Sequence, residues 1–227
     1  QCGASLSHRF DALDRIRRNT PGVAWNLMLR LLPTGHDSAS IDSGPGFRGV
    51  LWREWPNEAK KPTRQEWLNS VEKLSNRIVE DVKGNPDRWT SLIGDIHHLY
   101  PSARNTALDK LEKEIEESSD EDWKSALREK LRREINRHRS YPEADWSMDA
   151  SLLDRLYGLV QGLESKDLKE ENKWLFTDRP SLPVDAHSYR DELAKRRRKA
   201  LRVILDEEGE EGIVELAQQV SRPDEVG

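Results

Sequence analysis

The chain has 227 residues and a formal net charge of −5, and charged and hydrophobic residues each make up 35% of it. This hydrophobic share is low for one round core and suits a thin, elongated core in which every helix keeps one face in water. The acidic balance excludes a strong overall attraction to nucleic acid or to an anionic membrane.

Two helices are expected before residue 33. The first is predicted over about residues 5–19, because apolar side chains recur there at helical spacing. Thr20-Pro21 then supplies an N-cap and a proline at the first helical position. The helix from Pro21 to Leu32 is apolar on nearly all sides, so we expect it to be covered on several sides and to be the most buried element.

The helical pattern lapses from Pro33 to Pro62, which is a long connection for a compact domain. Its second half is rich in aromatic residues, and Trp52 and Trp55 lie on either side of Arg53. Exposed tryptophans beside an arginine are typical of a binding surface, so these three residues are candidate interaction residues. The alternative is that the tryptophans attach the long loop to the helices.

Four helices are predicted in the middle of the chain by capping residues and apolar stripes. Thr63 and Glu66 have the spacing of a capping box, in which each side chain satisfies a backbone amide of the other. The tyrosine at position 100 is expected on the inner face of the second of these helices, which Pro101 would stop. The expected starts and ends are Thr63 to Gly84, Asn85-Pro86 to Tyr100, Ser102 to about Ile115, and Ser119, with Asp122 three residues on, to Tyr141-Pro142.

The last third of the chain continues in the same way. We expect a buried helix through residues 152–163, a short helix near 167–176, a long helix over about 186–208 and a final helix over 213–220, preceded by Gly209 and Gly212. Strand signals are nearly absent, and most connections are short. The fold prediction is therefore all-α, with about ten helices packed as antiparallel hairpins in a solenoid-like array of the HEAT or TPR kind.

We expect residues 1–227 to be one helical-repeat region, with a subdivision into 1–62 and 63–227 as the alternative. The chain starts with Gln1 and ends just after a helical segment, which favours a piece of a longer polypeptide. The single cysteine, Cys2, excludes an internal disulfide and favours a reducing, cytoplasmic compartment. No signal peptide or apolar span of about 18 residues is present, so we expect no membrane partner.

The strongest local charge feature is the run Lys195-Arg196-Arg197-Arg198-Lys199 on the long helix. Together with Arg190, the arginines at 196, 197 and 198 complete the candidate interaction surface, because a basic helix face can hold a phosphate backbone. The alternative is a solvated face paired with neighbouring acids. No aromatic residues interleave with these cations as base-stacking platforms, so nucleic acid is the less favoured partner.

The remaining motifs carry no chemistry. Gly44–Gly49 matches the dinucleotide pattern G-x-G-x-x-G, but no strand precedes it and no helix follows, so we interpret it as a loop. His97 and His98 beside Asp95 lack the further ligands of a metal site. The acidic residues between 112 and 122 lack the pattern of a calcium loop. We therefore predict no catalytic residue, no cofactor and no metal, and no enzymatic activity for this chain.

Several segments nevertheless resemble a known family. They are 17–25 (RRNTPGVAW), 31–37 (LLPTGHD), 173–176 (KWLF) and 197–201 (RRKAL), the last running into Gly209. They are similar to the helical C-terminal region of very large bacterial signal-transduction NTPases of the STAND type, many of which belong to antiphage defence. The resemblance implies a sensor or interaction array, with nucleotide hydrolysis in upstream domains. No P-loop occurs here, so no nucleotide-binding residue is transferred.

These observations favour a non-catalytic module that binds a protein, senses a ligand or contacts upstream domains of the same polypeptide. The alternative is a nucleic-acid-contacting scaffold that uses the basic helix around 190–202. A third hypothesis is an enzyme of an unfamiliar helical type, which would need a polar pocket that periodicity does not reveal.

Overall fold

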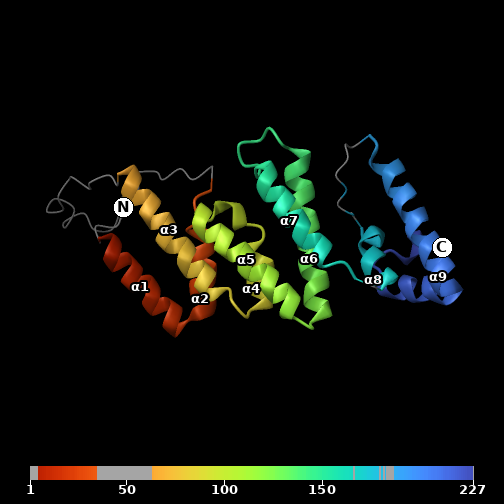
Figure 1. Cartoon of the computed structure of the whole chain (residues 1–227), viewed down its shortest axis with the longest axis horizontal. Coiled ribbons are helices and arrows are strands. Elements are labelled where there is room, and N and C mark those ends of the chain that lie inside the picture. Colours follow the sequence, from red (N-terminus) through yellow and green to blue (C-terminus); the bar gives the residue numbers. More distant parts are fainter. Residues whose placement is uncertain are drawn as a thin grey trace, which may run out of the picture. The chain divides into compact units, whose positions relative to one another are not determined.

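The computed structural model describes residues 5–34, 63–165, 167–178, 180, 182 and 187–226. Within these ranges every regular element is an α-helix or a short 3₁₀ helix, and no strand occurs (Figure 1). The all-α class predicted from the sequence is confirmed. In the same ranges, no helix combines the length and the apolar character that crossing a membrane requires.

The chain divides into two compact units. The first comprises Gln1–Arg88 and Asp95–Lys110, and the second comprises Trp89–Gly94 and Leu111–Gly227. The alternative boundary expected near residue 62 falls outside the described residues, so that subdivision stays a prediction.

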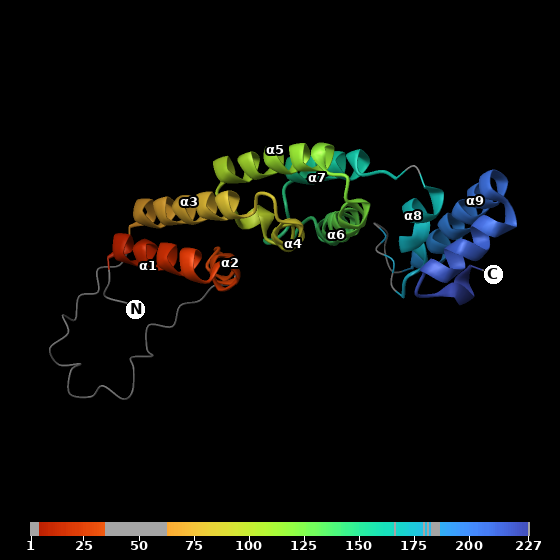
Figure 2. The ribbon, with the colours of Figure 1, turned by 90° about the horizontal axis from the view of Figure 1, so that it is seen from below.

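The first unit is built around three helices, α1 (Leu6–Asn19), α2 (Pro21–Arg30) and α3 (Arg64–Asp81). Helix α2 packs against both α1 and α3, and Figure 2 shows α1 running beside α3. The predicted capping box is present, with the Thr63 amide donating to Glu66 at 2.8 Å and the Glu66 amide donating to the Thr63 hydroxyl at 3.2 Å. Gly84 follows α3 with φ +68°, a conformation that glycine adopts without strain.

Helix α2 is not the uniformly buried element that its composition suggests. Trp25 and Met28 are buried on one face, whereas Val23 and Leu31 are 62% and 55% exposed. The expectation of burial on several sides is therefore wrong for this helix. Apolar composition alone does not ensure cover, because the number of packing neighbours depends on tertiary contacts rather than on the sequence of the helix itself.

The single helix expected from Asn85 to Tyr100 is divided in two. Helix α4 (Pro86–Leu92) ends early, and a 3₁₀ turn, η2 (Ile96–His98), follows it. Three of the four residues predicted on the inner face, Trp89, Ile93 and Ile96, are fully buried. The prediction is wrong for Tyr100, which follows η2 outside any helix and is only half-buried. Pro101 starts helix α5 (Pro101–Glu117) instead of stopping the preceding one, in keeping with the tolerance for proline in the first helical turn.

The second unit contains the long helix α6 (Glu121–Ser140), which packs against α7 (Ala150–Gly162). The N-cap of α6 is Asp120, one residue later than predicted, and its carboxylate accepts the amide of Trp123 at 2.9 Å. An aspartate caps as well as a serine does and adds a favourable charge at the positive end of the helix.

The C-terminal part of the second unit consists of α8 (Leu168–Asn172), the 3₁₀ helix η3 (Lys173–Phe176), α9 (Tyr189–Gln219) and the 3₁₀ helix η4 (Pro223–Glu225). Helix α9 is interrupted at Gly209, where φ is 71° and ψ is −165°, so the break predicted there is confirmed. Lys169 of α8 pairs with Glu208 at 2.5 Å and with Glu215 at 3.2 Å, one residue on each side of the interruption. Leu175, Phe176, Leu193, Ala200, Ile204 and Leu216 belong to the core of this part.

Candidate interaction surfaces

The first unit contains an apolar groove of about 910 Å³ between α1, α2 and α3. Apolar positions one helical turn apart, which the sequence placed on inner faces, form its walls. Val71 and Leu74, which line it, are buried, whereas Trp67, which also lines it, is 48% exposed. The apolar residues that line it are Leu6, Phe10, Ala12, Leu13, Ile16, Leu27, Leu31, Pro33, Trp67, Val71 and Leu74.

An ion-pair network fixes two walls of this groove relative to each other. Arg17 of α1 reaches Asp81 of α3 at 2.6 Å, and Arg77 of α3 reaches Asp14 of α1 at 2.7 Å. The guanidinium of Arg77 also lies 4.5 Å from the ring centroid of Phe10, which lines the groove. The network therefore positions an aromatic wall residue as well as the two helices.

Electrostatics within the network keep its members charged. Hydrogen bonds from Arg77, followed by those from Arg17, hold the pKa of the Asp14 carboxyl well below its usual range. Hydrogen bonding to Asp81 likewise raises the pKa of the Arg17 guanidinium. Partial burial opposes both shifts, because it disfavours charge.

The second candidate surface is the basic run on α9, and the structure separates its arginines into two groups. The Nε of Arg196 donates to Glu192 at 2.8 Å, and this bond lowers the pKa of the Glu192 carboxyl. Arg197 donates to the carbonyl of Leu175 at 2.8 Å and to Glu225 at 2.5 Å. Arg197 thus ties α9 to η3 and η4 inside the second unit.

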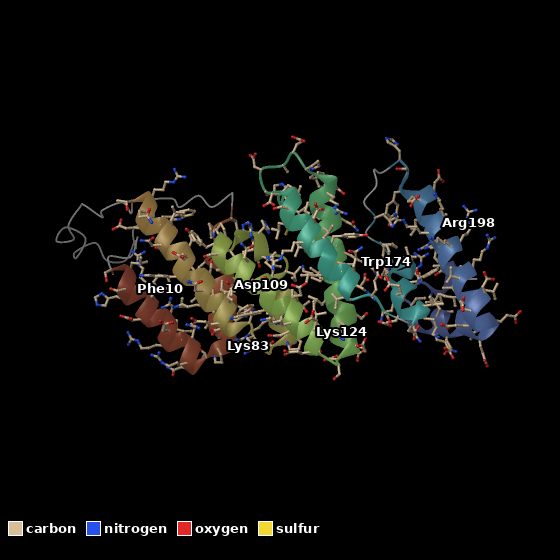
Figure 3. All side chains as sticks on the ribbon, viewed as in Figure 1. Phe10, Lys83, Asp109, Lys124, Trp174 and Arg198 are labelled. Atoms are coloured by element: carbon tan, nitrogen blue, oxygen red, sulfur yellow. The ribbon has the colours of Figure 1, made fainter. Side chains whose placement is uncertain are left out.

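The other two predicted arginines face outward. Arg190 is exposed at the start of α9. Arg198 is exposed further along the helix, where its Nε donates only to the backbone carbonyl of Ala194 among the described residues, at 3.3 Å. Figure 3 shows Arg198 on the outer side of α9.

Arg198 belongs to a cluster of four exposed cations that we call the cationic face. Its members are spaced at i, i+3, i+4 and i+7, which places them on one side of a helix. The opposite side carries the buried residues Leu193, Ala200 and Ile204. Within the described ranges, the only ion pair of a member is between Lys195 and Glu192, at 4.0 Å. The cationic face consists of Lys195, Arg198, Lys199 and Arg202.

A hollow of about 310 Å³ lies beside the cationic face and shares Lys199 with it. Trp174 of η3 lines this hollow, and the guanidinium of Arg132 of α6 lies 5.1 Å from its ring centroid. Arg132 is held in place by ion pairs with Glu171 and, at 3.2 Å, with Glu129. Arg132, Glu171, Asn172, Trp174, Leu175, Arg196, Lys199, Ala200 and Val203 line the hollow.

The sequence alone did not predict this hollow. Trp174 lies some 25 residues before Lys199 in the chain, so the run of cations looks free of aromatic neighbours when it is read linearly. The only clue in the sequence was that Trp174 stands directly before two further apolar residues, Leu175 and Phe176. In the structure both of these are buried against α9. Adjacent residues in a 3₁₀ helix point in different directions, which leaves the indole at the edge of that core.

The other predicted sites are placed as follows. Trp52, Arg53, Trp55 and the loop Gly44–Gly49 lie outside the described residues. His97 and His98 are partly buried in η2, and no group of three potential metal ligands is found in the part of the chain that the structure describes. In the acidic segment Glu114 has a structural role, since it accepts the indole N–H of the buried Trp89 at 2.7 Å.

Comparisons with protein-family models, with curated proteins and with solved structures find no match to this chain.

Proposed function

We propose that this chain is a non-catalytic protein-interaction module that binds an amphipathic helix of a partner through the groove of its first unit. The partner helix belongs either to another protein or to an upstream domain of the same polypeptide. The observation that carries the proposal is the apolar groove between three helices, with partly exposed Trp67 and Leu31 among the residues that line it. Large exposed apolar residues around a concave site are typical of helix-binding grooves.

The dimensions of the groove suit such a ligand. Its wall residues span nearly three turns of α1, from Leu6 to Ile16, and two turns of α3, from Trp67 to Leu74. Two turns correspond to about 10 Å, which accommodates anchors spaced at i, i+3 or i+4, and i+7 on a bound helix. Trp67 supplies an aromatic contact of the kind that dominates binding energy at protein interfaces.

The wider proposal is that the chain forms a solenoid-like array of antiparallel helical hairpins in a cytoplasmic STAND-type protein of a bacterial signalling or defence system. The packing of α2 against α1 and α3, and of α6 against α7, supports an array in which sequence neighbours pair. The resemblance of residues 17–25 and 31–37 to the helical regions of that family supports its origin. The coding sequence upstream tests this directly, since it should encode a P-loop nucleotide-binding module. An upstream region without one contradicts the STAND origin.

The binding proposal is tested by photo-crosslinking of the full chain in cells that produce it naturally. A benzophenone side chain at position 70, which lines the groove, should capture one defined protein, whereas the same group at the exposed Asn76 of the same helix should not. Leu31→Asp should abolish the crosslink, because a carboxylate in an apolar groove is unfavourable.

Val23→Asp is the matched control. Val23 lies on α2, of which Leu31 is the C-cap, and it is as exposed as Leu31 but does not line the groove. Equal crosslinking from positions 70 and 76, or equal loss in both aspartate variants, contradicts the proposal. Crosslinking of position 70 only to residues 35–62 of the same chain would show that the groove is covered by its own connection, which also contradicts it.

A further inference from the structure

We infer that the second unit binds single-stranded nucleic acid along α9, with the cationic face holding phosphates and the adjacent hollow accepting a base. This site is separate from the groove and does not depend on the proposed function. Two observations carry the inference: the exposed, largely unpaired side chains of the cationic face, and the indole and guanidinium groups that line the hollow next to Lys199.

The cationic face has the form that a phosphate backbone requires. Lys195 and Arg202 are seven residues apart, which corresponds to about 10 Å along the helix, so the four cations form a short strip. The core on the other side of α9 keeps this strip turned outward, because Leu193 and Ile204 are buried there. Arg196 pairs with Glu192 at 2.8 Å and Arg197 with Glu225 at 2.5 Å, so both are excluded from the phosphate-binding set. Lys195 stays in the set, because its contact with Glu192 is much longer, at 4.0 Å, and its side chain is exposed.

The hollow adds flat groups on which an unpaired base can stack. Trp174 and Arg132 both present flat π systems, and bases stack on aromatic rings and on guanidinium planes. Glu171 and Glu129 orient Arg132, so the guanidinium is fixed beside the indole before any ligand arrives. Lys199 lines the hollow and belongs to the cationic face, so it joins the base site to the phosphate strip.

The combination of the cationic face with the hollow favours single-stranded nucleic acid over a nucleic acid duplex or an acidic protein segment. A duplex keeps its bases paired and stacked, so it would use the strip but not the hollow. An acidic protein segment would use the strip without any flat group for the hollow. The overall charge of −5 does not oppose local binding, because charges separated by more than about 10 Å are largely screened at moderate salt.

The test is fluorescence anisotropy of the full chain with labelled oligo(U) and oligo(dT) of about 20 nucleotides, long enough to cover one such site. Four phosphate contacts to a single strand predict an affinity loss of about 50-fold between about 50 and 200 mM salt. Arg198→Glu with Arg202→Glu should weaken binding more than about tenfold at the lower salt and reduce the salt effect to about sevenfold.

Lys83→Glu with Lys113→Glu is the matched control, because Lys83 is exposed in the turn after α3 and Lys113 is exposed on α5. This reversal again changes the net charge by −4, from −5 to −9. This control should bind like the unaltered chain. A second variant pair tests the hollow: Trp174→Leu should weaken binding at least about fivefold, whereas Trp174→Phe, which keeps an aromatic ring, should weaken it less.

Several results would overturn the inference. One is the absence of binding at the lower salt, and another is equal binding by the two charge-reversal variants. Tighter binding of a duplex of the same length, unaffected by Trp174→Leu, would show that the hollow takes no base and would reject the single-strand assignment. Far-ultraviolet circular dichroism of each variant separates lost binding from lost folding.

Discussion

Replacement of the buried Arg128 by methionine should destabilise the second unit by about 3 kcal/mol. Arg128 is 1% exposed and extends from α6 to the C-terminal end of α7 and to α8. Its guanidinium donates to the carbonyl of Leu163 at 3.2 Å and to that of Glu170 at 2.7 Å, and it pairs with Glu171 at 2.6 Å. Methionine fills similar space but leaves both carbonyls without this donor.

The magnitude follows from what the substitution leaves behind. Removing one partner of a buried ion pair costs about 3–5 kcal/mol when the other charge is left uncompensated. Glu171 keeps its ion pair with Arg132 and its hydrogen bond from the amide of Ser165, so the lower end of that range applies. The Nε–H of Arg128 has no hydrogen-bond partner among the described residues, and removing this unsatisfied donor further limits the loss.

Urea denaturation followed by far-ultraviolet circular dichroism measures the effect. With a slope of about 2 kcal/mol per molar urea, the midpoint should fall by about 1.5 M. Arg128→Lys should recover only part of the loss, because an ammonium group cannot reproduce the planar fork that contacts three acceptors. A loss below about 1 kcal/mol for the methionine variant would refute the argument that these three contacts stabilise the unit.

Three further substitutions test the remaining contacts. Asp14→Asn should cost about 1 kcal/mol at neutral pH, discounted for partial exposure. Pairing with Arg77 lowers the folded-state pKa of Asp14, so its contribution to stability is present above the unfolded pKa of about 4 and is lost as the pH falls below it. The melting temperature of the variant should therefore fall less steeply with acidification than that of the unaltered chain, and an equally steep fall contradicts this. Trp89→Phe removes the hydrogen bond to Glu114 and leaves a gap beside a fully buried ring, so it should cost more than about 1–3 kcal/mol in urea denaturation, and a smaller loss contradicts a contribution from that bond. Gly209→Ala should lower stability by about 1 kcal/mol or more in the same assay, because φ is positive there, whereas a stabilised variant would mean that the interruption of α9 is not required.

The sequence predicted helix ends well where the signal is local. The capping box of α3, the break at Gly209 and the termination of α6 at Tyr141 depend on residues within one turn of each other. Predictions that required tertiary knowledge were less accurate. Val23 and Leu31 are apolar but exposed, and the early end of α4 at Leu92 leaves the apolar stripe intact, so periodicity alone does not reveal the break.

The basic run of α9 shows why the candidate surfaces were only partly predictable. Five consecutive cations surround a helix, and the apolar stripe through Leu193, Ala200 and Ile204 predicts from the sequence which side of the helix is buried, but not which cations have carboxylate partners. Burial of this stripe turns Arg197 inward and Arg198 outward although they are adjacent. The cationic face therefore includes Lys195, Lys199 and Arg202, which the predicted set of Arg190, Arg196, Arg197 and Arg198 did not contain.

The separation of the arginines of α9 into paired and outward-facing ones determines which variants can distinguish an effect on binding from an effect on folding. Neutralising Arg196, Arg197 and Arg198 together would remove one exposed cation along with the ion pair to Glu192 and the contacts of Arg197 with Leu175 and Glu225. Weakened binding by that triple variant would be ambiguous, because α9 would also lose its polar contacts with η3 and η4. Reversal of Arg198 and Arg202 leaves those contacts unaltered. Its effect on a nucleic acid ligand can therefore be assigned to the surface of α9.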